Sequence, residues 1–151
     1  MSTATKPSTA SNALHLEQAL NDLVKAFNLR RLSILNRYRV NEMEVEITHF
    51  LNEHEMKKMK EVGEHFNIKL STLTSTIDKL EKNKLVKRKN SKEDRRVIYI
   101  RPTAKGQSLL TELDESMRSI SESVANSLST SEFGSLAKGL ELIKESTKES
   151  A

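Results

Sequence analysis

The 151-residue chain contains no cysteine, which excludes disulfides, thiolate metal sites and redox sensing through a cysteine. Aromatic residues make up 4% of the sequence and tryptophan is absent, so Leu, Ile, Val and Met supply the apolar content. That composition suits helix packing more than a β-sandwich. No apolar run approaches the roughly 20 residues of a membrane-spanning helix, and no apolar segment near the N-terminus indicates a secretory signal. We therefore expect a cytoplasmic protein.

Sequence signatures of common enzymes are also missing. The chain has no Gly-rich phosphate loop, no nucleophile elbow and no HExxH motif. The segment Lys105–Ser108 superficially resembles the end of a phosphate loop but lacks the upstream glycine. His49 and His54 are five residues apart, a spacing at which one helix face does not bring them together. We expect no catalytic residue, no metal site and no cofactor, and so a protein that is not an enzyme.

Positive charge is concentrated in one segment. Residues Lys79–Lys105 include eleven Lys/Arg and three Asp/Glu, a net charge of +8, whereas the whole chain has a net charge of +4. Such a cluster favours a nucleic acid as partner. A membrane surface is less favoured, because no basic amphipathic helix has a bulky aromatic face.

A helix and two strands are predicted between Lys69 and Pro102. Leu73, Ile77 and Leu80 recur at spacings of four and three, the amphipathic pattern of a helix. Short hydroxyl and basic side chains occupy the opposite face: Ser71, Thr72, Ser75, Lys79 and Lys82. Strands are predicted over residues 85–89 and 97–100, with a polar turn between them. Helix, strand, basic turn and strand follow each other as in a winged helix, although the outer helix face alone could be an ordinary solvated surface.

This stretch resembles the MarR (multiple-antibiotic-resistance regulator) family of winged helix-turn-helix regulators. The resemblance covers the chain from about Leu14 to Lys144. Its matching motifs are Ser71–Thr74, Ile77–Glu81, Leu85–Arg88, the wing signature Asp94-Arg95-Arg96, and Thr103–Gly106. It implies a mainly α fold with a small β-wing. It also implies a homodimeric transcription regulator, commonly a repressor, that binds a pseudo-palindromic operator in double-stranded DNA and is released by a small aromatic or phenolic acid.

The resemblance divides the chain into three kinds of segment. Residues 1–12 are expected to be a disordered arm, because they are mostly Ser, Thr and Ala. Residues 13–40 and 103–148 read as long helices that would form the dimer. Residues 41–102 would form the winged helix-turn-helix.

The expected helix boundaries rest on local signals. Asn41 and Glu44 form a predicted capping box for a helix that ends near Glu53, with Met43 facing inward. Another helix is predicted over residues 57–66, and Asn67 after it suits a left-handed backbone. Thr103 and Ser129 are predicted to start the last two helices.

The start of the recognition helix departs from the family pattern. Lys69 stands where the family often has a serine, and a lysine cannot accept the free backbone N–H groups of the first turn. Either the cap moves to another residue or a bound phosphate stabilises the helix start. Ser75 stands where a longer basic residue is common. Both changes put in doubt an operator sequence borrowed from relatives.

The predicted DNA-binding residues combine short hydroxyls for base edges with cations for phosphates. The resemblance implies that Asp94 orients Arg96, which enters the minor groove; a mere surface ion pair is the alternative. The full set is Lys69, Ser71, Thr72, Thr74, Ser75, Lys79, Lys82, Arg88, Asp94, Arg95 and Arg96.

A ligand pocket is implied by the resemblance alone. It would lie between the dimer helices and the winged domain, near Arg37, Tyr38, His49 and Phe50, where Arg37 or Arg39 would hold a carboxylate. The alternative is a winged-helix module that binds a protein, or an architectural DNA-binding module, without ligand control.

Overall fold

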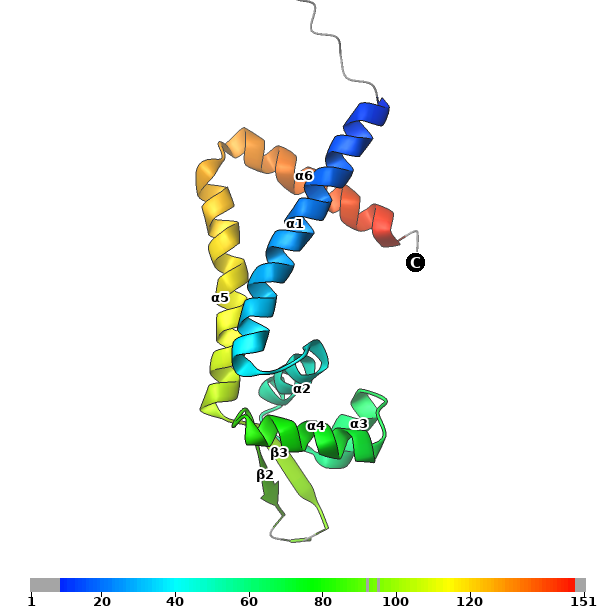
Figure 1. The fold of residues 1–151 in the computed structure, drawn as a ribbon, viewed down its shortest axis with the longest axis vertical. Coiled ribbons are helices and arrows are strands. Elements are labelled where there is room, and N and C mark those ends of the chain that lie inside the picture. Colours follow the sequence, from blue (N-terminus) through cyan, green and yellow to red (C-terminus); the bar gives the residue numbers. More distant parts are fainter. Residues whose placement is uncertain (1–8, 92, 95, 149–151) are drawn as a thin grey trace, which may run out of the picture. The chain divides into compact units, whose positions relative to one another are not determined.

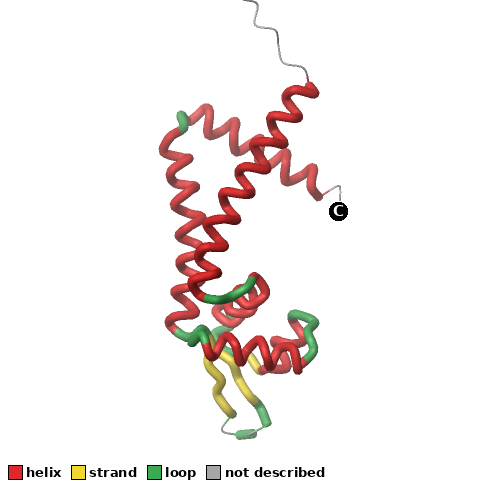
Figure 2. Tube along the Cα trace, in the orientation of Figure 1, coloured by secondary structure: helices red, strands yellow, loops and turns green. Residues whose placement is uncertain are grey.

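The computed structural model describes residues 9–91, 93–94 and 96–148. The chain divides into two units, Met1–Leu113 and Asp114–Ala151, and the division falls inside one helix. Figures 1 and 2 show mostly helices with one small sheet, which confirms the predicted fold class. The elements are α1 (Thr9–Tyr38), α2 (Glu42–Glu53), β1 (Lys57–Lys58), α3 (Met59–His65), α4 (Leu70–Lys82), β2 (Val86–Asn90), β3 (Ile98–Pro102), α5 (Ala104–Ser127) and α6 (Thr130–Lys148).

The core of the first unit joins the recognition helix to its neighbours. Leu73, Ile77 and Leu80 of α4 are fully buried, as their spacing predicts. They belong to one apolar cluster with Leu51 of α2 and Ile100 of β3. Because the inner face of α4 is held in this way, its outer face is left exposed to solvent.

A three-stranded antiparallel sheet completes the winged helix, with strand order β1-β3-β2. The hairpin of β2 and β3 projects beyond the helices of this unit (Figure 1), and Arg88 lies opposite Ile100 in its register. The predicted helix over residues 57–66 begins only at Met59. Lys57 and Lys58 instead pair with Ile100 and Tyr99 of β3, a long-range contact that a two-residue pattern does not reveal.

The predicted helix caps are confirmed. The Asn41 side chain accepts the Glu44 N–H, and the Glu44 carboxylate accepts the Asn41 N–H, both at 2.9 Å. Asn67 has a left-handed backbone with φ of 50°. The Gly106 N–H donates to the Thr103 hydroxyl at 3.1 Å.

Two further expectations are wrong in part. Thr9 to Asn12 were expected in a disordered arm but are helical, because a long helix extends at little cost once it has formed; residues 1–8 lie outside the described residues. Met43 was expected to face inward but is 42% exposed. The core side of α2 is taken by Val45, Ile47 and Leu51 instead.

The second unit contains the rest of α5 and α6. Ser129 and Glu132 form the predicted capping box, in which the Ser129 N–H donates to the Glu132 carboxylate at 2.9 Å. The hydrogen bond from the Ser129 side chain lowers the pKa of Glu132. Helix α6 buries none of its residues, and Phe133 and Leu140 are each 49% exposed. Each described helix is too short or too polar to cross a bilayer.

Candidate nucleic-acid interface

The turn between α3 and α4 sets the direction of the recognition helix. The Ile68 N–H donates to the Gly63 carbonyl at 3.0 Å, and Asn67 turns the chain with its left-handed backbone. A Cβ on Gly63 would lie 3.4 Å from the Ile68 carbonyl oxygen and 3.6 Å from Leu73. The small residue therefore permits close packing where the two helices meet.

The outer face of α4 presents the hydroxyls that the sequence predicted. Ser71, Thr72, Thr74 and Ser75 are all exposed. The Thr74 hydroxyl donates to the Leu70 carbonyl at 2.7 Å, and the Ser75 hydroxyl donates to the Thr72 carbonyl at 2.8 Å. With the hydroxyl hydrogen bound to the helix, each oxygen is left as an acceptor. Such an oxygen suits the amino groups of adenine and cytosine in the major groove.

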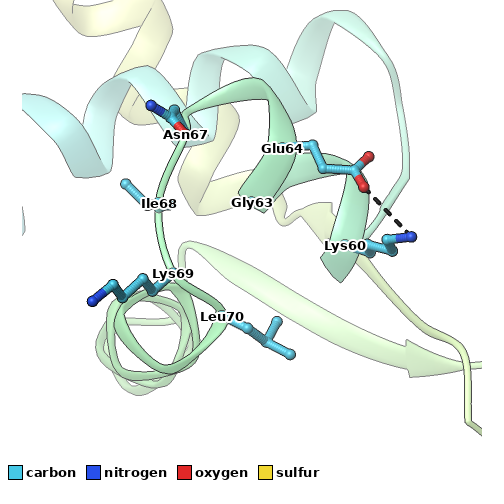
Figure 3. A pocket seen from close by; sticks show the side chains of 7 residues that line it. All are labelled: Lys60, Gly63, Glu64, Asn67, Ile68, Lys69 and Leu70. Atoms are coloured by element: carbon cyan, nitrogen blue, oxygen red, sulfur yellow. Dashed lines mark ion pairs between the residues drawn. The ribbon is translucent and has the colours of Figure 1, made fainter.

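The start of α4 has no side-chain cap. Lys69 is the N-cap residue, and within the described part of the chain no side chain accepts the N–H groups of the first turn. Of the two alternatives, the structure therefore does not show the one in which another residue caps the helix. A pocket lies beside this helix start (Figure 3), lined by Lys60, Gly63, Glu64, Asn67, Ile68, Lys69 and Leu70. Free N–H groups and a lysine together favour an anion at this point.

Lys79 forms an ion pair within the protein, although 48% of its side chain is exposed. Its ammonium lies 2.9 Å from both carboxylate oxygens of Glu44 at the start of α2. The Glu44 side chain is only 4% exposed. Lys82, three residues further along α4, is exposed. The two lysines were predicted to play the same role but stand in different environments.

Arg88 is engaged in the same way. Its guanidinium donates to Glu81 at 2.7 Å and lies 2.6 Å from an Asp78 carboxylate oxygen. It also donates to the Thr74 carbonyl at 3.3 Å. The side chain is 23% exposed, so Arg88 ties β2 to the recognition helix and neutralises two acidic residues on it.

The tip of the wing is ordered by Asp94 through the backbone. The Asp94 carboxylate accepts the Arg96 N–H at 2.9 Å, and Ser91 accepts the Asp94 N–H at 3.3 Å. Arg96 is exposed. In this structure Asp94 therefore orients Arg96 through the main-chain N–H of Arg96. Arg95 lies outside the described residues.

A second pocket adjoins the wing and contains cations that the sequence did not single out. Lys58 and Lys60 line it together with Thr74, Arg88 and Arg96. Lys58 is placed there because β1 pairs with β3. A longer strand would have signalled this position, but two residues carry no detectable alternation.

Of the four predicted ligand residues, Arg37 and Tyr38 share Glu112 as a partner, whereas His49 and Phe50 have other partners. Arg37 forms an ion pair with Glu112. Burial raises the pKa of Tyr38, to which Glu112 also contributes. His49 is exposed, and its ring lies 3.4 Å from a Glu53 carboxylate oxygen. The Lys105 ammonium lies 5.8 Å from the centre of the Tyr38 ring. The His65 ring stacks on the Phe50 ring, with 4.0 Å between the ring centroids.

Among residues 9–91, 93–94 and 96–148, acidic and histidine side chains form no cluster suited to a metal ion.

Comparison with known proteins agrees with this geometry. The model of the MarR family matches residues 40–98. An uncharacterized HTH-type transcriptional regulator of Bacillus subtilis (strain 168), YfiV, is 32% identical over 72 residues. That match covers 48% of this chain and 45% of the relative, so it spans less than half the length of the relative.

Solved structures share the fold over most of the chain. YusO from Bacillus subtilis aligns with a TM-score of 0.76 and 22% identity, covering 92% of this chain and 99% of YusO. A MepR–DNA complex of S. aureus aligns with a TM-score of 0.77 and 14% identity, covering 87% and 98%. FabT of Streptococcus pneumoniae in complex with DNA aligns with a TM-score of 0.57 and 18% identity, covering 89% and 99%.

The relative YfiV is named as a transcriptional regulator, which is the class of protein that the sequence predicts. The family match covers the turn, the recognition helix and most of the wing described above. The winged helix of this chain, over residues 40–98, is thus similar to that of the MarR family.

Proposed function

We propose that this chain is a homodimeric, cytoplasmic transcription regulator that binds a pseudo-palindromic operator in double-stranded DNA, most simply as a repressor. The observation that carries the proposal is the outer face of α4. Four exposed hydroxyl residues stand on a helix whose inner face is fully buried, so the base-reading groups rest on a rigid support. Two proteins that share the fold, MepR and FabT, have been solved with DNA.

The uncapped start of α4 would bind a DNA phosphate. The free N–H groups of its first turn carry partial positive charge, and Lys69 adds a full charge beside them. A phosphate bound there would fix the depth at which α4 enters the major groove. Lys82 would bind a second phosphate near the other end of the helix, where it is exposed.

The wing would bind the adjacent minor groove through Arg96. A narrow minor groove attracts arginine because its electrostatic potential is strongly negative. Asp94 fixes the backbone from which Arg96 extends. The short hydroxyls of α4 discriminate bases less sharply than arginine or glutamine, so DNA shape would contribute much of the specificity.

A second copy would cover the apolar residues that the long helices expose. On α1, Leu16, Leu23 and Leu32 are about half exposed, and on α6 Phe133, Leu136 and Leu140 are similarly exposed. Exposed apolar residues in such number on single helices mark interaction surfaces. A two-fold dimer would place two recognition helices about one helical turn of DNA apart.

A small aromatic or phenolic acid would relieve DNA binding. Tyr38 and Phe50 pack against the core cluster from its edge, where a ring could join them. Arg37 is the nearest cation for a carboxylate, and the ligand would have to replace Glu112 as its partner.

Fluorescence anisotropy tests the proposal. The purified protein is first used to select duplexes from a random-sequence library, and the enriched duplex is compared with a scrambled one at several salt concentrations. Preferential binding with a salt slope on the order of −5 or steeper supports a regulator with several phosphate contacts. Equal weak binding to both duplexes supports an architectural module instead. No binding at low salt overturns DNA binding and favours a protein partner.

A further inference from the structure

Lys79 sits on the recognition helix, yet its charge is matched within the protein. Its ammonium lies 2.9 Å from each carboxylate oxygen of Glu44. The same carboxylate accepts the Asn41 N–H at 2.9 Å and so caps α2. One buried carboxylate therefore holds both the start of α2 and the last turn of α4.

The buried Glu44 carboxylate depends on the Lys79 ammonium for charge compensation. A carboxylate that is 4% exposed cannot be solvated by bulk water, so loss of its cation leaves an uncompensated buried charge. A DNA phosphate that drew Lys79 away would create this situation. The cost of breaking the pair therefore opposes the use of Lys79 as a phosphate contact.

A second contact links the same regions. The Asn83 side chain at the end of α4 donates to the Arg39 carbonyl at 3.1 Å. Arg39 has a left-handed backbone with φ of 58° and forms the turn that connects α1 to α2. Lys105 of α5 in turn donates to the Asn83 carbonyl at 3.0 Å. Lys79 thus holds α4 to the start of α2, and Asn83, one helical turn further along, holds its end to the α1–α2 turn.

We propose that Lys79 is a positioning residue, which sets the orientation of the recognition helix through Glu44 and the α1–α2 turn instead of binding DNA. The inference rests on the proposed DNA-binding function. In this positioning role, Lys79 contributes to sequence discrimination without adding to the number of neutralised phosphates. Lys82 on the same helix is the phosphate-binding counterpart.

The test compares Lys79→Gln with Lys82→Gln on the selected and the scrambled duplex. Lys82→Gln should make the slope of log affinity against log salt shallower by about 1 and leave the ratio of the two affinities unchanged. Lys79→Gln should leave the slope unchanged and lower the ratio severalfold, because a displaced helix misplaces its hydroxyls. If Lys79 only stabilises the fold, Lys79→Gln changes the melting temperature but leaves the salt slope and the affinity ratio of the folded protein unchanged.

The double variant Glu44→Gln/Lys79→Gln removes both charges and keeps a side chain that can cap Asn41. It should melt closer to the wild-type protein than Lys79→Gln does and recover part of the affinity ratio. If Lys79→Gln does not fold, the double variant still lacks Lys79, and its salt slope decides the question.

Three outcomes overturn the inference. A salt slope and an affinity ratio that both stay unchanged in folded Lys79→Gln assign Lys79 a stabilising role alone. A slope made shallower by about 1 in the variants that lack Lys79, with the affinity ratio kept, assigns Lys79 to a phosphate and leaves the proposed function standing. A wild-type protein that enriches no duplex from the library overturns the proposed function and this inference together.

Discussion

Gly106 of α5 lies directly against the main chain of Leu85, where a Cβ on Gly106 would be 2.2 Å from the Leu85 carbonyl oxygen. The same carbonyl accepts the Thr103 N–H at 2.9 Å, so neither backbone can retreat without breaking this contact. The start of α5 is thereby fixed to the segment between α4 and β2.

Replacing Gly106 by alanine should therefore destabilise the protein by about 2 kcal/mol or more, since the added methyl group meets a main-chain atom instead of a flexible side chain. Gly139 of α6 is the control, because its Cβ would meet nothing within 4 Å. Gly139→Ala should be neutral or stabilise by roughly 0.5–1 kcal/mol through helix propensity. Urea unfolding of both variants measures the difference, and equal stabilities would contradict the close approach.

Arg88→Ala should weaken DNA binding on all duplexes and lower stability by about 2 kcal/mol. The substitution leaves Asp78 and Glu81 without their guanidinium on the helix that is proposed to face DNA, and it releases β2 from α4. Arg88→Lys should restore only part of both losses, because one ammonium cannot reproduce the planar fork.

Lys89→Ala is the control for Arg88, since Lys89 is an exposed neighbour on the same strand. Anisotropy and thermal unfolding provide the two measurements. A Lys89 variant that loses as much stability as Arg88→Ala would show that the ion pairs of Arg88 contribute little.

The pair of Arg31 and Glu42 predicts a pH-dependent contribution to stability. The hydrogen bond from Arg31 lowers the pKa of Glu42, so the folded state favours the carboxylate. The contribution is present above the ordinary pKa of a glutamate and is lost as the pH falls through the lowered pKa. Because both side chains are largely exposed, we expect at most about 1 kcal/mol at pH 7.

Glu42→Gln should therefore lower the melting temperature at pH 7, and its difference from the wild-type protein should shrink as the solution is acidified. Glu17→Gln, on the exposed part of α1, is the control and should show no such trend. A difference that stays constant from neutral to acidic pH would contradict the role of the pair.

Leu140→Asp should shift the protein from dimer to monomer and weaken DNA binding in parallel. A carboxylate on the apolar side of α6 opposes burial against a second copy. Ser135→Asp adds the same charge to the same helix away from Leu136 and Leu140, and should leave the dimer intact. Sedimentation velocity at several concentrations distinguishes the two variants, and a wild-type protein that sediments as a monomer would refute the proposed assembly.

Local signals in the sequence were sufficient for most of the winged helix. The spacing of Leu73, Ile77 and Leu80 predicted the buried face of α4, and all three are fully buried. Asn41 with Glu44 predicted a capping box that is present in both directions. These features depend on residues at most seven positions apart, where helix geometry alone decides which side chains meet.

The roles of the cations could not be assigned in the same way. Lys79, Lys82 and Arg88 look alike in the sequence, as basic residues in or beside one charged segment. Their environments differ because Glu44 lies 35 positions from Lys79, and because β2 folds back so that Arg88 meets Asp78 and Glu81. The strand β1 was missed for a related reason, since its two residues are strand only through pairing with β3.

The sequence by itself determined the class of fold, the face of α4 turned inward, the helix ends and the location of the positive charge, because periodicity and capping are short-range properties of the chain. Tertiary structure alone decided which cations on that charged face are paired with carboxylates of the protein itself. That choice depends on the burial of a carboxylate and on contacts between distant segments, which exist only after α2, α4 and the wing have packed together.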